Sequence, residues 1–318
     1  MCLSPRLNAV PDAWVRLSPY QVEVRDRVRS RMQDGTYAME IVPCFCGGTD
    51  TLTLAKRDRY GLPVTTVLCS RCGLLRTSPR MSRDATTRFY REDYRALYEG
   101  ERKENDRWAQ QTEKGETFFP VIMRLFPETR TVYEVGCGMG GILLPFARNG
   151  LEVTGCDYDE DYLAVGRAQG LNLVRGNAAA LLDHCGKKAD LVLLVHVLEH
   201  FLDLREELKR VAALVRPGGI LLVEVPGIRS VQSFYQNDLL MYLQNAHTYH
   251  FSAATLGYVL ASAGLEVLHI DEEALAIAQR PLAASLRPRP SVPAGEARTL
   301  IRFLAETEKT FLRDSPTP

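Results

Sequence analysis

The sequence lacks net charge, because 39 Lys and Arg residues balance 39 Asp and Glu residues. A balanced chain has no global field that attracts nucleic acid or an anionic membrane, so we expect partners to be recognised locally and no nucleic acid among them. The sequence also lacks any apolar run near the ~18 residues of a membrane helix, and residues 1–11 lack the apolar centre of a signal peptide. These absences predict a cytoplasmic protein without a membrane span.

Lysine is scarce, with 7 residues against 32 arginines, and no internal repeat is visible. Together with abundant Ala and Leu, this bias indicates a GC-rich bacterial gene. The length of 318 residues is enough for a full core and suggests either two domains or one domain with attachments.

Four of the eight cysteines form two close pairs, Cys44 with Cys46 and Cys69 with Cys72, and a glycine follows each pair directly. In a cytosolic chain, cysteines are more often metal ligands or buried apolar residues than disulfides. Glycine suits a zinc knuckle, where the backbone bends so that N–H groups point at sulfur, and two strand-like stretches lie between the pairs. We therefore expect one structural zinc ion on these four thiolates. The single residue between Cys44 and Cys46 departs from the usual spacing, and the alternative is that the thiols only pack.

Residues 131–141 predict a short β-strand followed by a glycine loop that opens onto a helix at 142–149. Gly136 and Gly138 allow a sharp turn and a close approach of the backbone to a ligand, and the following helix offers free N–H groups. With Gly141 they also satisfy the dinucleotide pattern G-x-G-x-x-G. The loop alone therefore indicates a nucleoside cofactor without deciding which one.

The predicted strands that follow bring polar residues to their carboxyl ends. The strand at 151–156 ends at Asp157, which is placed to take two ribose hydroxyls, and the strand at 171–174 leads to Asn177, whose amide is suited to the adenine amino edge. A strand at 189–195 runs into His196, and a helix at 202–215 ends before Pro217-Gly218-Gly219 and a strand at 220–225.

This ordered set of signals over about residues 130–280 resembles the class I S-adenosylmethionine-dependent methyltransferases. The resemblance implies a Rossmann-like α/β core with a seven-stranded, mostly parallel sheet, and S-adenosylmethionine as cofactor. It also favours this cofactor over NAD. The residues expected to bind it lie at the carboxyl ends of the first four strands: Glu134, Gly136, Gly138, Asp157, Tyr158, Asn177, Ala178 and His196.

Chain order suggests five segments. They are an N-terminal helical extension (1–39), a zinc-ribbon segment (40–80), a helical cap or linker (81–129), the cofactor-binding core (130–280), and a Pro-rich linker with a C-terminal helix (281–318). Tyr90, Tyr94 and Tyr98 recur at i, i+4 and i+8, which places three phenols on one side of a helix. Such a stripe is typical of half-buried packing and, alternatively, of a substrate-binding surface.

A zinc ribbon ahead of a Phe-Tyr-x-x-x-Tyr-Arg helix and this core resembles a bacterial group that acts in sugar and cell-surface glycan biosynthesis. Its sugar C-methyltransferases carry a Tyr-His-Glu-His motif, where this chain has Gln244, Asn245, Ala246 and His247. C-methylation needs a carbanion next to a keto group, so Ala246 in place of the glutamate weakens that assignment.

We therefore expect O-methylation of a sugar or glycan hydroxyl. The alternatives are C-methylation of a keto nucleotide-sugar, and a non-catalytic scaffold that only binds the cofactor. A hydroxyl benefits from a base that removes its proton, and His200 and His247 are the candidates because both follow strand ends; His196 and His250 come second. For each histidine a structural role is the alternative. Glu199 is expected either to orient His200 or to cap the following helix.

Overall fold

The computed structural model describes residues 3–8, 12–100, 104–282 and 290–314, which build two compact units. The first, here called the cysteine unit, consists of Met1–Glu101, Pro226–Tyr258 and Ser291–Pro318. The second, the core unit, consists of Arg102–Val225 and Val259–Pro290. Parts of the expected segments 1–39, 81–129 and 281–318 lie outside the described residues.

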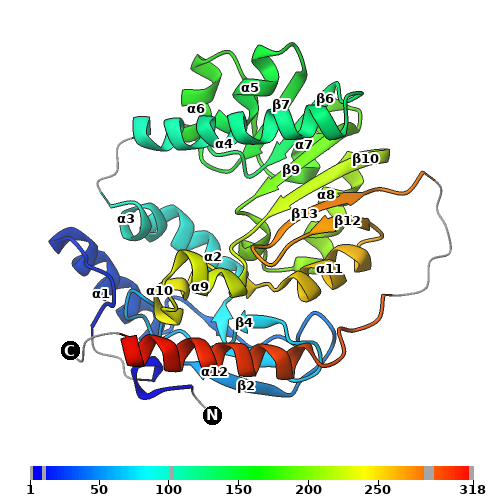
Figure 1. Cartoon of the computed structure of the whole chain (residues 1–318). Coiled ribbons are helices and arrows are strands. Elements are labelled where there is room, and N and C mark those ends of the chain that lie inside the picture. Colours follow the sequence, from blue (N-terminus) through cyan, green and yellow to red (C-terminus); the bar gives the residue numbers. More distant parts are fainter. Residues whose placement is uncertain (1–2, 9–11, 101–103, 283–289, 315–318) are drawn as a thin grey trace. The chain divides into compact units, whose positions relative to one another are not determined.

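The core unit is built on a seven-stranded sheet with the order β12-β13-β10-β9-β6-β7-β8 (Figure 1). The five strands from β10 to β8 are parallel, and β13 is antiparallel to both of its neighbours. This confirms the Rossmann-like fold and the seven-stranded, mostly parallel sheet expected from the sequence. The strands are β6 (Thr131–Val135), β7 (Glu152–Asp157), β8 (Asn172–Arg175), β9 (Ala189–Val195), β10 (Val215–Glu224), β12 (Glu266–Ile270) and β13 (Leu275–Gln279).

Helices cover both faces of this sheet (Figure 1). One face buries alternate residues of β9, Leu191, Leu193 and Val195, against helices α4, α5 and α6. Helices α7 and α8 pack on the other face, because successive side chains of a strand point to opposite sides. The helices are α4 (Glu104–Leu125), α5 (Leu144–Arg148), α6 (Glu160–Ala168), α7 (Ala178–Cys185) and α8 (Leu204–Leu214), with short 3-10 turns at Gly141–Leu143 and Leu198–His200.

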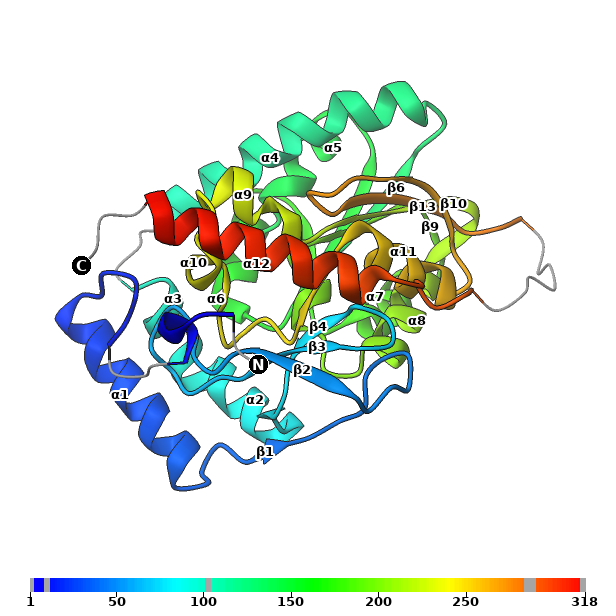
Figure 2. The ribbon, with the colours of Figure 1, turned by 60° about the horizontal axis from the view of Figure 1, so that its bottom comes forward.

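The cysteine unit contains a four-stranded antiparallel sheet in the order β11-β4-β3-β2. One face of it packs through Leu68 and Leu75 against α9, α10 and α12, and Figure 2 shows α12 running along this sheet. The strands are β2 (Thr51–Ala55), β3 (Thr66–Cys69), β4 (Leu75–Thr77) and β11 (Tyr249–His250), while β1 (Met39–Glu40) pairs with β5 (Arg80–Met81). The helices are α9 (Val231–Phe234), α10 (Leu239–Tyr242) and α12 (Glu296–Asp314), with 3-10 turns at Pro5–Leu7 and Ile228–Ser230.

A second helical cluster in the cysteine unit is formed by α1 (Pro19–Gln33), α2 (Arg83–Phe89) and α3 (Arg95–Tyr98). The tyrosine stripe lies here, but Tyr90–Tyr94 forms a π-helix between α2 and α3. The Tyr90 and Tyr94 rings stack with centroids 4.5 Å apart, and Tyr94 and Tyr98 are 4.9 Å apart. The expected alignment of three phenols is therefore present.

The two units group the chain differently from the five consecutive segments. Residues 226–258, which follow the fifth strand of the core, and the C-terminal helix α12 join the cysteine unit. Helix α11 (Ala253–Ser262) begins in one unit and ends in the other. The grouping arises because β11 pairs with β4 and apolar residues of α12 complete the core over Leu68 and Leu75, contacts that chain order does not reveal.

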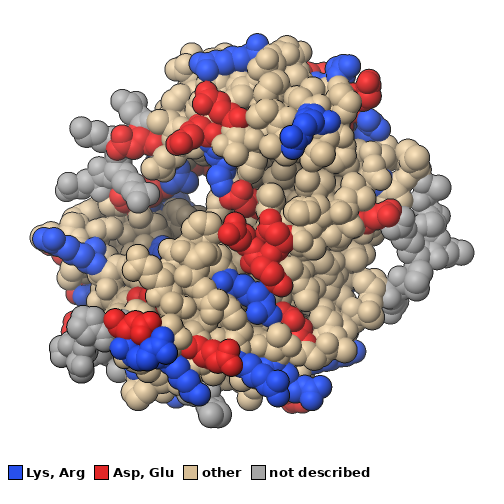
Figure 3. Space-filling model, in the orientation of Figure 1, with Lys and Arg blue, Asp and Glu red and all other residues tan. Residues whose placement is uncertain are grey.

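Acidic and basic side chains are interspersed on the face shown in Figure 3, in keeping with the zero net charge. Within the described parts of the chain, no helix combines the length and the apolar character that crossing a membrane would require.

Candidate cofactor and metal sites

The glycine loop after β6 has the conformation that the sequence predicts. Gly136 and Gly138 have φ angles of 72° and 54°, and the N–H groups of Gly136 and Cys137 both donate to the carbonyl of Cys156, at 2.8 and 3.0 Å. A Cβ atom on Gly136 would lie 2.4 Å from Cγ2 of Val197. Glycine is therefore required there for its φ angle and for the close approach of the chain that follows β9.

Asp157, at the end of β7, holds this loop in place. Its Oδ2 accepts the N–H of Gly138 at 2.8 Å, and its Oδ1 accepts the N–H of Asp159 at 2.9 Å. Burial raises the pKa of this carboxyl group. Each carboxylate oxygen can accept a second hydrogen bond, so the pair of ribose hydroxyls expected from the sequence still has acceptors.

Glu134 is a buried acidic residue in β6. It is 1% exposed, and its Oε2 has no hydrogen-bond partner among the described residues. Desolvation, with a smaller contribution from Asp157, raises its pKa well above the ordinary value. A buried acidic group of this kind is stabilised by a cationic ligand, and S-adenosylmethionine carries both an ammonium and a sulfonium group.

Two further residues expected to bind a nucleoside are Asn177, at the start of α7, and Tyr158, directly after β7. Asn177 caps this helix, since its Oδ1 accepts the N–H groups of Ala179 and Ala180 at 3.0 and 3.3 Å. The amide oxygen is therefore occupied, and the NH₂ group is what Asn177 offers to a ligand, which favours a ring nitrogen over the adenine amino edge. Tyr158 follows Asp157 and is 68% exposed, so its ring is accessible for stacking.

Helix α4 supplies a contact that the sequence analysis missed. Gln111 donates to the carbonyl of Cys137 and accepts from the N–H of Gly141, both at 3.3 Å. A Cβ atom on Gly141 would lie 2.6 Å from Cβ of Gln111, so this glycine lets α4 lie directly on the loop. No motif marks Gln111, because the contact depends on how α4 packs.

A group of charged residues surrounds His196, at the carboxyl ends of β9 and β10. Its Nε2 lies 3.0 Å from Oε1 of Glu224, and its Nδ1 lies 3.7 Å from Oε1 of Glu199. Desolvation lowers the pKa of His196, but the two carboxylates outweigh it and raise the pKa to about 9. Lys114 of α4 also pairs with Glu224. Such a protonated imidazole is suited to holding a negatively charged or polar group and unsuited to accepting a proton at neutral pH.

His200 lies in the 3-10 turn after β9, and its Nε2 is 3.7 Å from Oε1 of Glu199. The tight turn brings this carboxylate near both His196 and His200, as the orienting role predicts, whereas the capping role falls to Asp203, whose side chain accepts the N–H of Glu206. His247 belongs to the cysteine unit, where Thr77 donates to its carbonyl at 3.0 Å. The two candidate bases thus lie on different units.

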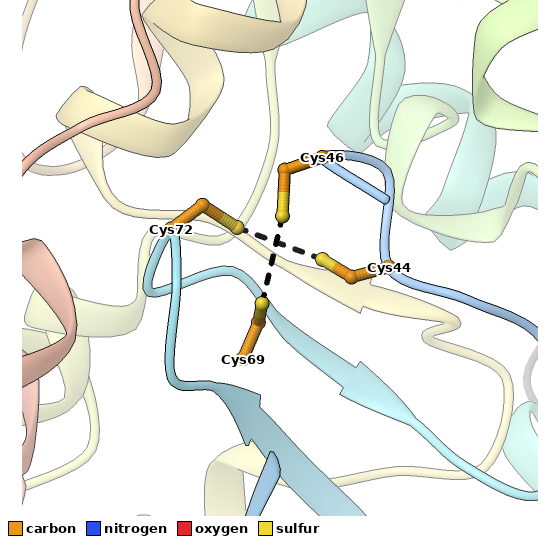
Figure 4. A group of neighbouring side chains, drawn as sticks. All are labelled: Cys44, Cys46, Cys69 and Cys72. Atoms are coloured by element: carbon orange, nitrogen blue, oxygen red, sulfur yellow. Dashed lines mark hydrogen bonds between the residues drawn. The ribbon is translucent and has the colours of Figure 1, made fainter. Parts of the chain in front are cut away.

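The four paired cysteines converge in the cysteine unit (Figure 4). Sγ of Cys44 lies 3.5 Å from Sγ of Cys72, Sγ of Cys46 lies 3.6 Å from Sγ of Cys69, and all four sulfur atoms are within 4.8 Å of one another. A tetrahedral zinc ion with Zn–S bonds near 2.3 Å places its sulfur ligands ~3.8 Å apart. The thiols can therefore hold a metal ion without rearrangement.

The two knuckles have matching backbone geometry despite their unequal spacing. Gly47 and Gly73 have φ angles of 79° and 80°, and their N–H groups donate to the carbonyls of Cys44 and Cys69. The next N–H in each knuckle points at a sulfur: Gly48 at Cys46 at 3.4 Å, and Leu74 at Cys72 at 3.5 Å. Such N–H···S bonds stabilise thiolates, as expected for metal ligands.

Residues 107–270 match a family model described as a methyltransferase domain, and this stretch is just over half of the chain. The chain belongs to this methyltransferase family. Its core unit has the class I S-adenosylmethionine-dependent methyltransferase fold, as the sequence resemblance implied.

Curated relatives match the chain over part of their length. A ubiquinone biosynthesis O-methyltransferase of Mesorhizobium japonicum is 35% identical over 109 residues, which are 33% of this chain and 43% of the relative. A protein of the same name from Rhizobium etli is 30% identical over 148 residues, 43% of this chain and 60% of the relative. The chain thus spans about half the length of these relatives.

Solved structures similar to the chain include an amino pentose methyltransferase of Micromonospora echinaspora, with a TM-score of 0.42 and 18% identity over 59% of this chain and 96% of that chain. A possible histamine N-methyltransferase of Thermotoga maritima has a TM-score of 0.43 and 20% identity over 57% of this chain and 95% of that chain.

The residues at the carboxyl ends of β6, β7 and β8 fit S-adenosylmethionine. Glu134 would face the ammonium or sulfonium charge, Asp157 the ribose hydroxyls, and Asn177 with the N–H of Ala178 the adenine. When bound, the cofactor supplies an electrophilic methyl group on a good leaving group. The chain itself then has to align a nucleophile with that methyl and exclude water.

Arg76 lies on the same sheet face as Cys69, one of the four candidate metal ligands. Val67 pairs with Arg76 across β3 and β4, and Cys69 is two residues beyond Val67, so all three side chains share one face. Arg76 is 3% exposed, and its Nε and Nη1 have no hydrogen-bond partner among the described residues. A divalent ion on four thiolates keeps a charge of about −2, which would balance this buried guanidinium.

Proposed function

We propose that this protein is an S-adenosylmethionine-dependent methyltransferase that methylates a hydroxyl group of a sugar or glycan. The observation that carries the methyltransferase assignment is the buried, uncompensated carboxylate of Glu134 beside a glycine loop held by Asp157. A cationic nucleoside cofactor satisfies both features, whereas the pyrophosphate of a dinucleotide would be repelled by Glu134.

One observation supports an oxygen acceptor and another supports a sugar. The curated relatives are named ubiquinone biosynthesis O-methyltransferases, which concerns only the acceptor atom. In addition, Tyr90 is 37% exposed and stacks on Tyr94, which offers a flat aromatic surface of the kind that packs against sugar rings. C-methylation of a keto nucleotide-sugar remains the main rival, and Ala246 at the position of an acid/base residue disfavours it. A non-catalytic scaffold that only binds the cofactor is the second rival, and methyl transfer to an acceptor distinguishes it from an enzyme.

In this proposal a histidine, His200 or His247, removes the proton of the hydroxyl as the C–O bond forms. Replacement of the responsible imidazole should lower turnover by roughly 10²–10⁴ with nearly unchanged cofactor affinity. The charged surroundings of His196 make it a poor base, which leaves it the cofactor-binding role. A structural zinc ion on Cys44, Cys46, Cys69 and Cys72 belongs to the same proposal, and four thiolates leave it no open position for catalysis.

The test is methyl transfer from labelled S-adenosylmethionine to a panel of nucleotide sugars, glycan termini and an acceptor of ubiquinone biosynthesis, with the methylated atom located by NMR. We expect an O-methylated sugar product, and none from an Asp157→Ala variant. Exchange of a substrate α-proton with solvent without cofactor would instead establish C-methylation. Cofactor binding without transfer to any acceptor would favour the scaffold.

A further inference from the structure

Hydrogen bonds within the cysteine unit hold each residue of the segment 245–247 in place. The N–H of Asn245 donates to Oδ2 of Asp58 at 3.0 Å, and the N–H of Ala246 donates to the hydroxyl of Tyr98 at 3.1 Å. Thr77 holds the carbonyl of His247 at 3.0 Å. His247 is 6% exposed, so its imidazole is held in one orientation.

A chain of side-chain hydrogen bonds leads from Arg59 to this imidazole. Arg59 is anchored by its N–H to the carbonyl of Leu243 at 3.0 Å and by Nη1 to the carbonyl of Met241 at 3.1 Å. Its Nη2 donates to Oε1 of Gln244 at 2.6 Å. The other amide atom of Gln244, Nε2, contacts Nε2 of His247.

The direction of each bond follows from the donors available. A guanidinium has only donors, so the Gln244 atom that faces Arg59 must be the oxygen. The amide then turns its NH₂ group towards His247, and Nε2 of the imidazole must accept. A neutral imidazole has one donor and one acceptor nitrogen, so the proton of His247 resides on Nδ1.

Protonation at Nε2 would bring an N–H against the NH₂ of Gln244, and flipping the amide would bring its NH₂ against Arg59. We infer that Arg59 and Gln244 are positioning residues that fix His247 as the Nδ1–H tautomer, so that the lone pair of Nε2 is engaged by Gln244 and His247 does not remove the proton of the methyl acceptor. The role towards the acceptor rests on the proposed function, and it leaves His200 as the base. The tautomer itself rests on the hydrogen bonds alone.

The tautomer is measured by long-range ¹⁵N–¹H NMR of the full-length protein labelled on histidine, with His247→Asn used to assign the signal. We expect Nδ1–H in the native protein over neutral pH. Gln244→Glu replaces the NH₂ by an acceptor of the same shape and should move the proton to Nε2. Gln232→Glu, an exposed change of the same kind in the same unit, should leave the His247 signal unchanged. A native Nε2–H signal, or an unchanged signal in Gln244→Glu, would overturn the inference.

Two substitutions test whether His247 acts as a base. If Gln244 engages Nε2, His247→Asn and His247→Ala should each retain turnover within about tenfold, the size of one hydrogen bond. A loss of roughly 10²–10⁴ in both variants would identify a base and overturn the inference. If no acceptor is methylated at all, the proposed function fails while the NMR result still decides the tautomer.

Discussion

The carboxylate of Asp157 accepts a hydrogen bond from the backbone N–H of Gly138 at 2.8 Å, so the residue expected to hold the ribose also holds the glycine loop. Two strands, β6 and β7, are linked at their carboxyl ends by this bond. The candidate cofactor site is therefore partly preformed by its own acidic residue.

Replacing Asp157 with Ala should weaken S-adenosylmethionine binding by about 1.5–3 kcal/mol, because it removes hydrogen bonds made by a charged group and the support of the loop. Titration calorimetry measures the change, and Asp183→Ala, an exposed change on α7, serves as the control. Unchanged affinity in the Asp157 variant would reject this placement of the cofactor.

Gly141→Ala should destabilise the core unit, because the new Cβ would lie 2.6 Å from Cβ of Gln111 and 3.0 Å from the N atom of Thr112. Overpacking of this kind costs about 1–3 kcal/mol, measured by chemical denaturation. Gly150→Ala is the comparison, since that position is open and only its φ of 80° resists a side chain. A Gly141 variant as stable as the native protein would mean that α4 moves freely on the loop.

Purified protein should contain about one zinc ion per chain, as four thiolates in a tetrahedral arrangement imply. Conversion of Cys69 and Cys72 to Ser should remove the metal and lower the melting temperature of the cysteine unit, whereas Cys185→Ser should retain the metal. Elemental analysis and calorimetry provide both measurements. Metal-free protein of full stability would show that the thiols only pack.

Arg76→Leu should lower zinc affinity by about tenfold or more, because the charge that balances the metal–thiolate group is lost. Arg76→Lys keeps the charge and should lose less, and Arg91→Leu, a side chain 70% exposed in the same unit, should have no effect. Competition with a chromogenic chelator gives the affinities. Equal affinity in the Leu and native proteins would separate Arg76 from the metal site.

The stability of the cysteine unit should fall as the pH drops below about 6.5. Burial lowers the pKa of His250 to about 3, and its two ring nitrogens have no hydrogen-bond partner among the described residues. Between these values the unfolded chain binds the proton and the folded chain does not, so acid favours unfolding by up to several kcal/mol.

His250→Phe should flatten this part of the pH profile, recorded as denaturant midpoints from pH 7 to pH 4. His269, whose side chain is 57% exposed, provides the control position. A profile of unchanged slope in the Phe variant would assign the acid sensitivity to other groups.

The sequence by itself determined the elements of the core and the residues at the strand ends. Hydrophobic periodicity and turn-forming residues predicted the strand at 131–135 and the turn at Gly136. The position of Asp157 at the end of the second strand indicated it as a candidate cofactor ligand. These predictions were possible because each signal is local in the chain. The spacing of the two cysteine pairs likewise predicted one cluster. The positive φ angles of Gly47 and Gly73 show the knuckle turns for which those glycines were expected.

Only the tertiary structure decided which distant segments meet. Chain order gave no sign that β11 pairs with β4, that Gln111 closes on the glycine loop, or that Arg59 reaches Gln244. These contacts join residues from 30 to 185 positions apart, and they depend on side-chain packing and on the pairing of hydrogen-bond donors with acceptors. The proton position on His247 follows from such a contact, so no motif at that residue could have revealed it.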